Sequence, residues 1–337
     1  MTLTNLSREN PSSETTPVAN GTNAVAIGSG SVANGQHSFS IGQNTVSGTT
    51  GGQNYAVAIG YSATGTGAFS TSVGGFTGAT AQHALAVGTY AQATGVRSSS
   101  IGRALASGAD SLASSLTSTS SSYGAQGASS VAIGKEAKAT GAGSIALSTK
   151  TYTGGAVATG SGSVAIGDGA AASGLLGMAI GRGATASGTM SMAYGRDSQA
   201  TQEESKAFGY RSYSDVTGCF AYASGYFGAA NGDAQGRQYI LRNATTDATA
   251  TVLTTDAGNA TTNNQIKVPA NSVVVFDGVI TACQSGVAAY AGWRVEGMIT
   301  NDGGTTVIQN NTITAIKNES GWRCRLSAND STDSLVV

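Results

Sequence analysis

Charged and aromatic side chains are scarce in this sequence of 337 residues. Lys, Arg, Asp and Glu make up 10% of it, aromatic residues make up 6%, and the formal net charge is −1. An average soluble domain carries roughly 25% charged residues. A chain with so little positive charge has no means of attracting a phosphate backbone, so we expect no nucleic acid partner.

Proline is also rare, with 3 residues against 49 glycines, and glycine does not recur at every third position. This excludes a collagen-like helix. Disorder is a poor fit, because 40% of the residues are hydrophobic and the net charge is close to zero. No run of about 18 apolar residues occurs, so we expect no membrane-spanning helix and no insertion into a membrane.

Cysteine is limited to Cys219, Cys283 and Cys324, whose spacing matches no metal-binding motif. The first residues, Met1–Pro17, are polar and lack the apolar stretch of a signal peptide. We therefore expect synthesis in a reducing cytoplasm with free thiols. Pairing of Cys283 with Cys324 is left open.

A short repeat fills the chain from about residue 20 to residue 225. It reads small, apolar, small, large apolar, glycine, as in Ala24–Gly28 (AVAIG) and Ser130–Gly134 (SVAIG). Most copies are 14 residues apart, and a degenerate copy at Ser111–Ser115 fills the longest gap, which gives about 14 coils. We predict that the large apolar residue of each copy forms the structural core of the repeat; these residues are Ile27, Ile41, Ile59, Val73, Val87, Ile101, Ile133, Leu147, Ile166 and Ile180, followed by Tyr194, Phe208 and Tyr222.

Each repeat is predicted to form two short strands with glycine at the corners, where a positive φ has no steric cost. Residues two apart on a strand share a face, so Val25 and Ile27 lie on one side and Ala26 on the other. We expect the large apolar residues to fill the interior and the alanines and serines to face a neighbouring chain. About two large apolar residues per coil make a poor core for one chain, which predicts self-association.

These repeats resemble the head repeats of YadA-like trimeric adhesins, whose motif is close to SVAIGxxAxAxGxx. The resemblance covers residues 24–223 and implies a trimeric, left-handed parallel β-roll with receptor contacts on its outer surface. We therefore expect an all-β protein with a β-solenoid over residues 21–230. The secretion signal, coiled-coil stalk and barrel anchor of trimeric autotransporters are not recognisable here. Bacteriophage tail fibres carry the same repeats without those parts, and this is the context we expect.

Residues 231–337 resemble a β-domain found at the ends of phage fibre and tail proteins. The resemblance rests on residues 232–235 (GDAQ), 239–242 (YILR), 244–247 (ATTD) and 268–271 (VPAN). Alternating β-branched runs predict an antiparallel, sandwich-like module with a turn at Asp302–Gly304. Its predicted strands span residues 238–242, 248–253, 265–268, 272–281, 289–300, 305–309, 312–317 and 322–327.

No arrangement of residues points to catalysis, a cofactor or a metal ion, so we expect a protein that is not an enzyme. Glycine pairs such as Gly28 and Gly30 fit repeat corners better than a phosphate-binding loop. The two histidines, His37 and His83, occupy equivalent repeat positions, where we expect them on the surface.

Aromatic residues gather at the end of the repeats, between Tyr210 and Phe227. We expect them to form a hydrophobic plug on the last coil; a saccharide-stacking platform is the alternative. Candidate receptor contacts in the C-terminal module are Tyr290, Trp293 and Trp322. The alternative role for the two tryptophans is in the core of that module.

These observations predict a homotrimeric phage tail fibre, made in the host cytoplasm and carried on the virion. It would attach to a host surface glycan or protein by multivalent, non-covalent binding. Residues 1–20, with Pro11 and Pro17 in a Ser/Thr-rich context, are expected to be an extended segment that docks into a tail or baseplate protein. A structural virion fibre without a receptor site and a passenger fragment of a bacterial trimeric adhesin are the alternatives. A polysaccharide depolymerase would need paired carboxylates along a groove, and the repeats have almost none.

Overall fold

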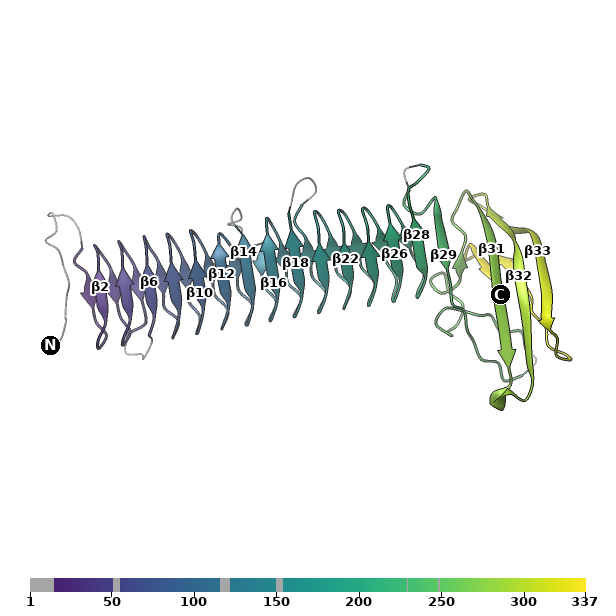
Figure 1. The fold of residues 1–337 in the computed structure, drawn as a ribbon, viewed down its shortest axis with the longest axis horizontal. Helices are drawn as coiled ribbons and strands as arrows, with labels where there is room; N and C mark the ends of the chain where they lie inside the picture. Colours follow the sequence, from purple (N-terminus) through teal and green to yellow (C-terminus); the bar gives the residue numbers. More distant parts are fainter. Residues whose placement is uncertain (1–14, 51–54, 116–121, 150–153, 229, 248) are drawn as a thin grey trace. The chain divides into compact units, whose positions relative to one another are not determined.

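The computed structural model describes residues 15–50, 55–115, 122–149, 154–228, 230–247 and 249–337 (Figure 1). The chain divides into two compact units, residues 1–197 and 198–337. Strands form nearly all of the regular structure in the described residues, and the one helix there is a 3-10 turn, η1 (Ser285–Val287). The predicted all-β fold class is confirmed.

Two short strands per repeat make up the first unit, as predicted. Its odd-numbered strands are β1 (Val18–Ala19), β3 (Val32–Ala33), β5 (Val46–Ser47), β7 (Thr64–Gly65), β9 (Gly78–Ala79), β11 (Gln92–Ala93), β13 (Leu105–Ala106), β15 (Gly124–Ala125), β17 (Lys138–Ala139), β19 (Val157–Ala158), β21 (Ala171–Ala172) and β23 (Thr185–Ala186). Its even-numbered strands are β2 (Val25–Ile27), β4 (Phe39–Ile41), β6 (Val57–Ile59), β8 (Thr71–Val73), β10 (Leu85–Val87), β12 (Ser99–Gly102), β14 (Leu112–Ser115), β16 (Val131–Gly134), β18 (Ile145–Ser148), β20 (Val164–Ile166), β22 (Met178–Ile180) and β24 (Met192–Tyr194). The degenerate repeat copy is confirmed as β14.

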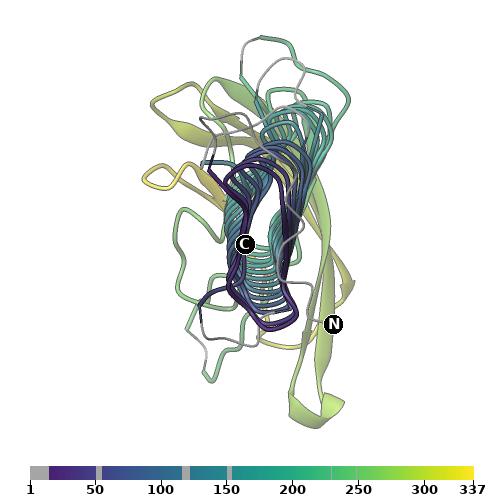
Figure 2. The same cartoon turned by 90° about the vertical axis from the view of Figure 1, so that its left-hand side faces the viewer.

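Equivalent strands of successive coils pair in parallel and in register. Ala26 of β2 lies opposite Ser40 of β4, and Ile27 lies opposite Ile41. The odd-numbered strands stack in the same way, with Ala19 opposite Ala33. Figure 2 looks along this stack, and each coil appears as a flattened loop with one sheet on either side. The predicted β-solenoid is therefore confirmed.

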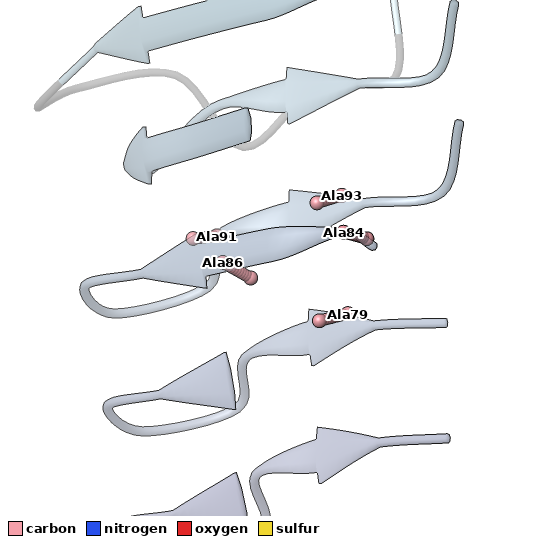
Figure 3. Packing of buried hydrophobic residues seen from close by; sticks show 5 residues of the cluster. All are labelled: Ala79, Ala84, Ala86, Ala91 and Ala93. Atoms are coloured by element: carbon pink, nitrogen blue, oxygen red, sulfur yellow. The ribbon is translucent and has the colours of Figure 1, made fainter. Parts of the chain in front are cut away.

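The interior of the coils contains alanine and serine, which reverses the predicted orientation of the strands. The middle residue of each even-numbered strand points inward and is buried, as Ala86 and Ser100 are, and so is the last residue of most odd-numbered strands, such as Ala93. Figure 3 shows five buried alanines of this interior: Ala79, Ala86 and Ala93 from these strand positions, and Ala84 and Ala91 from the residues just before a strand. The narrow space between the two strands of a coil is filled by these small residues and by Thr45 and Thr77, and the large apolar residues face outward.

Glycine at the corners is required by the close stacking of backbones. A Cβ atom on Gly160 would overlap the carbonyl oxygen of Gly174 in the next coil. At the other corner, Gly167 has a φ of +126°, and a Cβ atom there would lie 2.7 Å from the carbonyl oxygen of Gly181. Both the conformation and the lack of a side chain are therefore needed.

The second unit begins with two more coils, formed by β25 (Gln199–Ala200), β26 (Lys206–Gly209), β27 (Tyr213–Ser214) and β28 (Phe220–Ala223). With twelve coils in the first unit, the described residues contain the predicted fourteen. The free edge of β28 is covered by an antiparallel strand, β29 (Gln235–Gln238). The predicted aromatic plug is wrong, because Tyr222, Tyr226 and Phe227 are exposed. A backbone strand ends the stack in their place.

Two antiparallel sheets of three strands form the rest of the second unit. One contains β31 (Ser272–Cys283), β32 (Tyr290–Asn301) and β33 (Thr306–Lys317); the other contains β30 (Ile266–Lys267), β35 (Ser334–Val336) and β34 (Ser327–Asn329). Their shared core is built on Val268, Ile299 and Leu335. The predicted antiparallel C-terminal module is confirmed, including the turn at residues 302–304, where Gly303 has a φ of +93°.

Several predicted strand boundaries in this module are wrong. The two strands predicted at residues 305–309 and 312–317 are one strand, β33. Register shifts in its pairing with β32 allow β33 to continue through the residues between the two predicted strands. Residue 238 ends β29, whereas residues 239–242 and 249–253 form no strand, and Arg242 makes one isolated bridge, with Thr254. There the Asp247 carboxylate accepts a hydrogen bond from the Thr249 amide at 2.8 Å, and such local bonds compete with strand pairing.

The predicted domain boundary at residues 230/231 stays a prediction. The compact units divide at residues 197/198, whereas the repeat strands run to Ala223. Residues 1–14 of the predicted N-terminal docking segment lie outside the described residues, and Val18 and Ala19 of that segment already belong to the first coil.

Candidate assembly and attachment surfaces

Two columns of apolar side chains run along the outer face of the even-numbered strands in the first unit. The ten residues predicted to form the repeat core make one of these columns, and none of them is buried in the single chain. Ile101 and Ile133, for example, are 45% and 41% exposed. Their predicted place inside each coil is wrong. The second column lies two residues earlier and contains Val25, Phe39, Val57, Leu85, Leu112, Val131, Ile145, Val164, Met178 and Met192, with Thr71 and Ser99 as polar interruptions.

The outer face of the odd-numbered strands is different in composition. Its outward residues are of two kinds: some are polar or small, and others are large and apolar. The polar or small ones include Gln92, Lys138, Thr185, Gly78 and Ala171, and the large apolar ones are Val18, Val32, Val46, Leu105 and Val157. The two broad faces of the coils thus differ in polarity, and only the even-numbered strands present a continuous apolar surface. We call the latter the apolar face.

Many buried hydroxyl groups inside the coils are paired locally, whereas others have no hydrogen-bond partner; these are the hydroxyls of Ser31, Ser47, Ser70, Ser98, Ser144, Ser163 and Ser191. The Ser40 hydroxyl donates to Thr45 Oγ1 at 2.8 Å, and the Ser72 hydroxyl donates to Thr77 Oγ1 at 2.7 Å. Ser130 donates to the Gly127 carbonyl at 2.7 Å. An interior of methyl groups and hydroxyl pairs contributes little hydrophobic stabilisation, so most of the apolar area of this unit remains on its surface.

Exposed aromatic rows occupy the corners of the N-terminal coils. His37, Tyr55, Phe69 and His83 stand in successive coils with nearly parallel rings whose centroids are 4.7 to 5.2 Å apart. The predicted surface position of both histidines is confirmed. All four residues have positive φ values, between 42° and 59°, as do non-aromatic residues at the same repeat position, such as Asn23 and Arg97. The two middle rings, Tyr55 and Phe69, are stacked on both faces and therefore present only their edges to a partner.

The three predicted receptor contacts do not form one surface. Trp293 is 7% exposed, on the face of β32 that packs toward the core, whereas Tyr290 is 50% exposed on the opposite face. The Tyr290 ring is capped by the Lys317 ammonium group, 3.7 Å from the ring centroid. Trp322 is half-buried in a segment between β33 and β34. Of the three, only Tyr290 is available to a partner on the single chain; a receptor contact at any of them stays a prediction.

A buried ionic cluster joins the last coil to the strands that follow it. The Asp215 carboxylate lies 2.9 Å from the Arg237 guanidinium and 2.7 Å from the Lys267 ammonium. The side chains of Asp215 and Arg237 are 8% and 10% exposed. Arg237 Nη1 also donates to the Tyr239 hydroxyl at 3.4 Å, and burial raises the pKa of Tyr239 well above its ordinary value. Burial likewise raises the pKa of the Cys219 thiol.

Sequence reasoning missed this cluster, because its members are 22 and 52 residues from Asp215 and form no motif. We infer a structural role, since the carboxylate is almost fully buried and is paired with two cations of the same unit. No group of three or more His, Cys, Asp or Glu residues capable of holding a metal ion occurs in the described part of the chain. Within that part, no helix is long and apolar enough to cross a membrane.

Comparison with known proteins agrees with this architecture, a β-solenoid with one apolar face. The family described as YadA head domain repeat (2 copies) matches residues 19–45, 79–104, 125–147, 154–170, 172–198 and 186–212. The chain therefore carries YadA head repeats, which indicate an adhesin-like fibre. A search of curated proteins found no match.

Proposed function

We propose that three copies of this chain assemble through their apolar faces. The observation that carries the proposal is the double column of large apolar side chains outside a core of alanine and serine. Contiguous exposed apolar surfaces of this kind mark interaction sites. A closed three-fold arrangement brings the same face of each copy toward a common axis. In that assembly the ten predicted residues would form a core shared between chains.

We further propose that the assembly is the tail fibre of a phage and attaches to a glycan or protein on the host cell. The adhesin-type repeats support an attachment role. Three identical chains present each weak contact three times, so avidity supplies the strength of binding without catalysis. Docking of the N-terminal segment into a tail or baseplate protein belongs to the same proposal. A passenger of a bacterial trimeric adhesin is the alternative that the repeats support equally.

The assembly can be tested with two lysine substitutions in one coil. Ile180→Lys places a charge on the apolar face, whereas Thr185→Lys places it on the opposite sheet, where Lys138 already occupies an equivalent position. We expect sedimentation to give a mass of three protomers for the parent chain and for Thr185→Lys, and of one protomer for Ile180→Lys at low concentration. A trimeric Ile180→Lys variant, or a monomeric parent chain, would overturn the proposed assembly.

Attachment and location need separate experiments. The purified protein should adsorb to host cells and compete with infection, and the monomeric Ile180→Lys variant should adsorb far more weakly because avidity is lost. Antibodies against residues 231–337 should label purified virions. Labelling of bacterial surfaces in uninfected cultures would favour the bacterial adhesin instead.

A further inference from the structure

The sheet formed by β31, β32 and β33 has two long edges without a strand partner among the described residues. β32 pairs with both neighbours along its length, whereas β31 and β33 each pair on one side only. Both edge strands are 12 residues long. Their outer edges therefore present rows of backbone N–H and C=O groups that can accept another strand.

Protection against strand addition is weak on these edges. Natural edge strands are usually guarded by lysine, proline or inward-pointing charges. β31 contains no proline, lysine or arginine, and its one charged residue is Asp277; β33 has a single charge at its end, Lys317. Exposed apolar side chains line both strands, and Val275 and Ile316 are 79% and 66% exposed. Such edges favour association.

In the described residues, no other element packs on the face of this sheet that points away from the core. Residues of β31 alternate, so that Val274 and Phe276 pack against the core. On the other face, Val273, Val275 and Val279 are exposed, and Asp277 lies between the last two. Met298 of β32 lies opposite Val275 and shares its face. The small sheet of β30, β34 and β35 thus covers one face, and on the other the valines of β31, with Asp277 among them, remain open.

We propose that β33 of a second copy adds to the outer edge of β31, so that three copies close a ring of nine strands. This inference rests on the proposed trimer and specifies its contact in the C-terminal module. Self-pairing of β31 would require a two-fold axis, which a three-fold assembly does not have. Only the β31–β33 contact repeats around the ring and leaves no free edge.

Strand directions agree with this closure. β31 and β33 are both antiparallel to β32 and hence parallel to each other. Rotation about an axis along the strands preserves direction, so β33 of the neighbour runs parallel to β31. In-phase pairing of two strands of equal length places Cys283, at the end of β31, next to Lys317 of the neighbouring chain. The open face of β31, with its three valines and Asp277, then faces the common axis.

A cysteine scan along the end of β33 tests the contact. Cys283 and residue 317 of one chain are separated by β32, roughly 10 Å across two strand spacings, which is too far for a disulfide within the chain. In a Cys324→Ser background, Thr314→Cys, Ala315→Cys, Ile316→Cys and Lys317→Cys cover the neighbouring registers. Gln309→Cys, exposed on the same strand but far from Cys283, is the matched control.

After oxidation we expect at least one scan variant to run as a covalent trimer on a denaturing gel, and the control to remain uncross-linked. Hydrogen exchange of the parent chain should show every amide of β31 as protected as those of β32. If no scan variant forms a covalent trimer, or if about half of the β31 amides exchange freely, the ring is overturned. If the ring is overturned in this way but sedimentation still gives a mass of three protomers, the proposed trimer stands. A mass of one protomer would overturn both the trimer and the ring.

Discussion

Substitution of Asp215 tests whether the buried ionic cluster stabilises the last coil of the repeats. Its carboxylate bridges Arg237 and Lys267 at 2.9 and 2.7 Å, and Asp215→Ala leaves both cations without that partner. Removing one member of a buried ion pair costs about 3–5 kcal/mol. The Lys267 side chain is 34% exposed and stays hydrated, so the penalty falls mainly on Arg237. We therefore expect the lower end, about 3 kcal/mol.

Thermal unfolding measures this effect at a fixed protein concentration. For a unit of this size, about 3 kcal/mol corresponds to a fall of roughly 6–12 °C in the midpoint. Asp110→Ala is the matched control, because it breaks the ion pair with Arg97, in which both side chains are exposed, and should change the midpoint little.

A double variant separates charge burial from packing. Replacing the pair with apolar groups, as in Asp215→Ala with Arg237→Met, removes the buried charge and should recover part of the lost stability. If Asp215→Ala melts at the same temperature as Asp110→Ala, the ionic cluster does not hold the last coil, and the reasoning from its burial is wrong.

Three further predictions concern other sites. Gly160→Ala should destabilise the protein by about 1–3 kcal/mol, because the added methyl group meets the next coil, whereas Gly225→Ala, which has open space around its Cβ position, should not; urea unfolding compares them. Because burial raises the pKa of Tyr239, stability should be constant below the unfolded pKa of about 10 and fall above it, and Tyr239→Phe should reduce that alkaline loss in pH-dependent unfolding. Trp293→Ala should cost about 3–5 kcal/mol of stability, whereas Tyr290→Ala should leave the fold unchanged and weaken cell adsorption if Tyr290 contacts the receptor; unchanged adsorption removes it from the candidates.

Much of the repeat architecture could be predicted from the sequence. The spacing of residues such as Ile27, Ile41 and Ile59 fixes the coil length, and in-register pairing follows from it. The alternation of Val25, Ala26 and Ile27 separates two faces but does not say which one is inside. The inside is decided by the narrow space between the two strands of a coil, which is filled by alanine, serine and, in two coils, threonine.

Other features could not be predicted because they depend on contacts far apart in sequence. Asp215 meets Lys267 across 52 residues, and nothing near either residue signals the pairing. The corner row of His37, Tyr55, Phe69 and His83 did have a signal, since each residue lies four positions before an apolar anchor. The sequence does not reveal that this position has a left-handed backbone, because glycine is not required there.

In-register stacking also determines which changes in length the chain can accept. Removal or duplication of one whole repeat leaves every remaining strand with an equivalent neighbour, so the number of coils is free to vary between related proteins. Loss of a single residue within β20 would turn Ala165 outward and drive Val164 or Ile166 into the narrow space that the Ala165 methyl group fills. Genes for such repeats should therefore gain and lose length in whole repeats or at the corners, and almost never inside a strand.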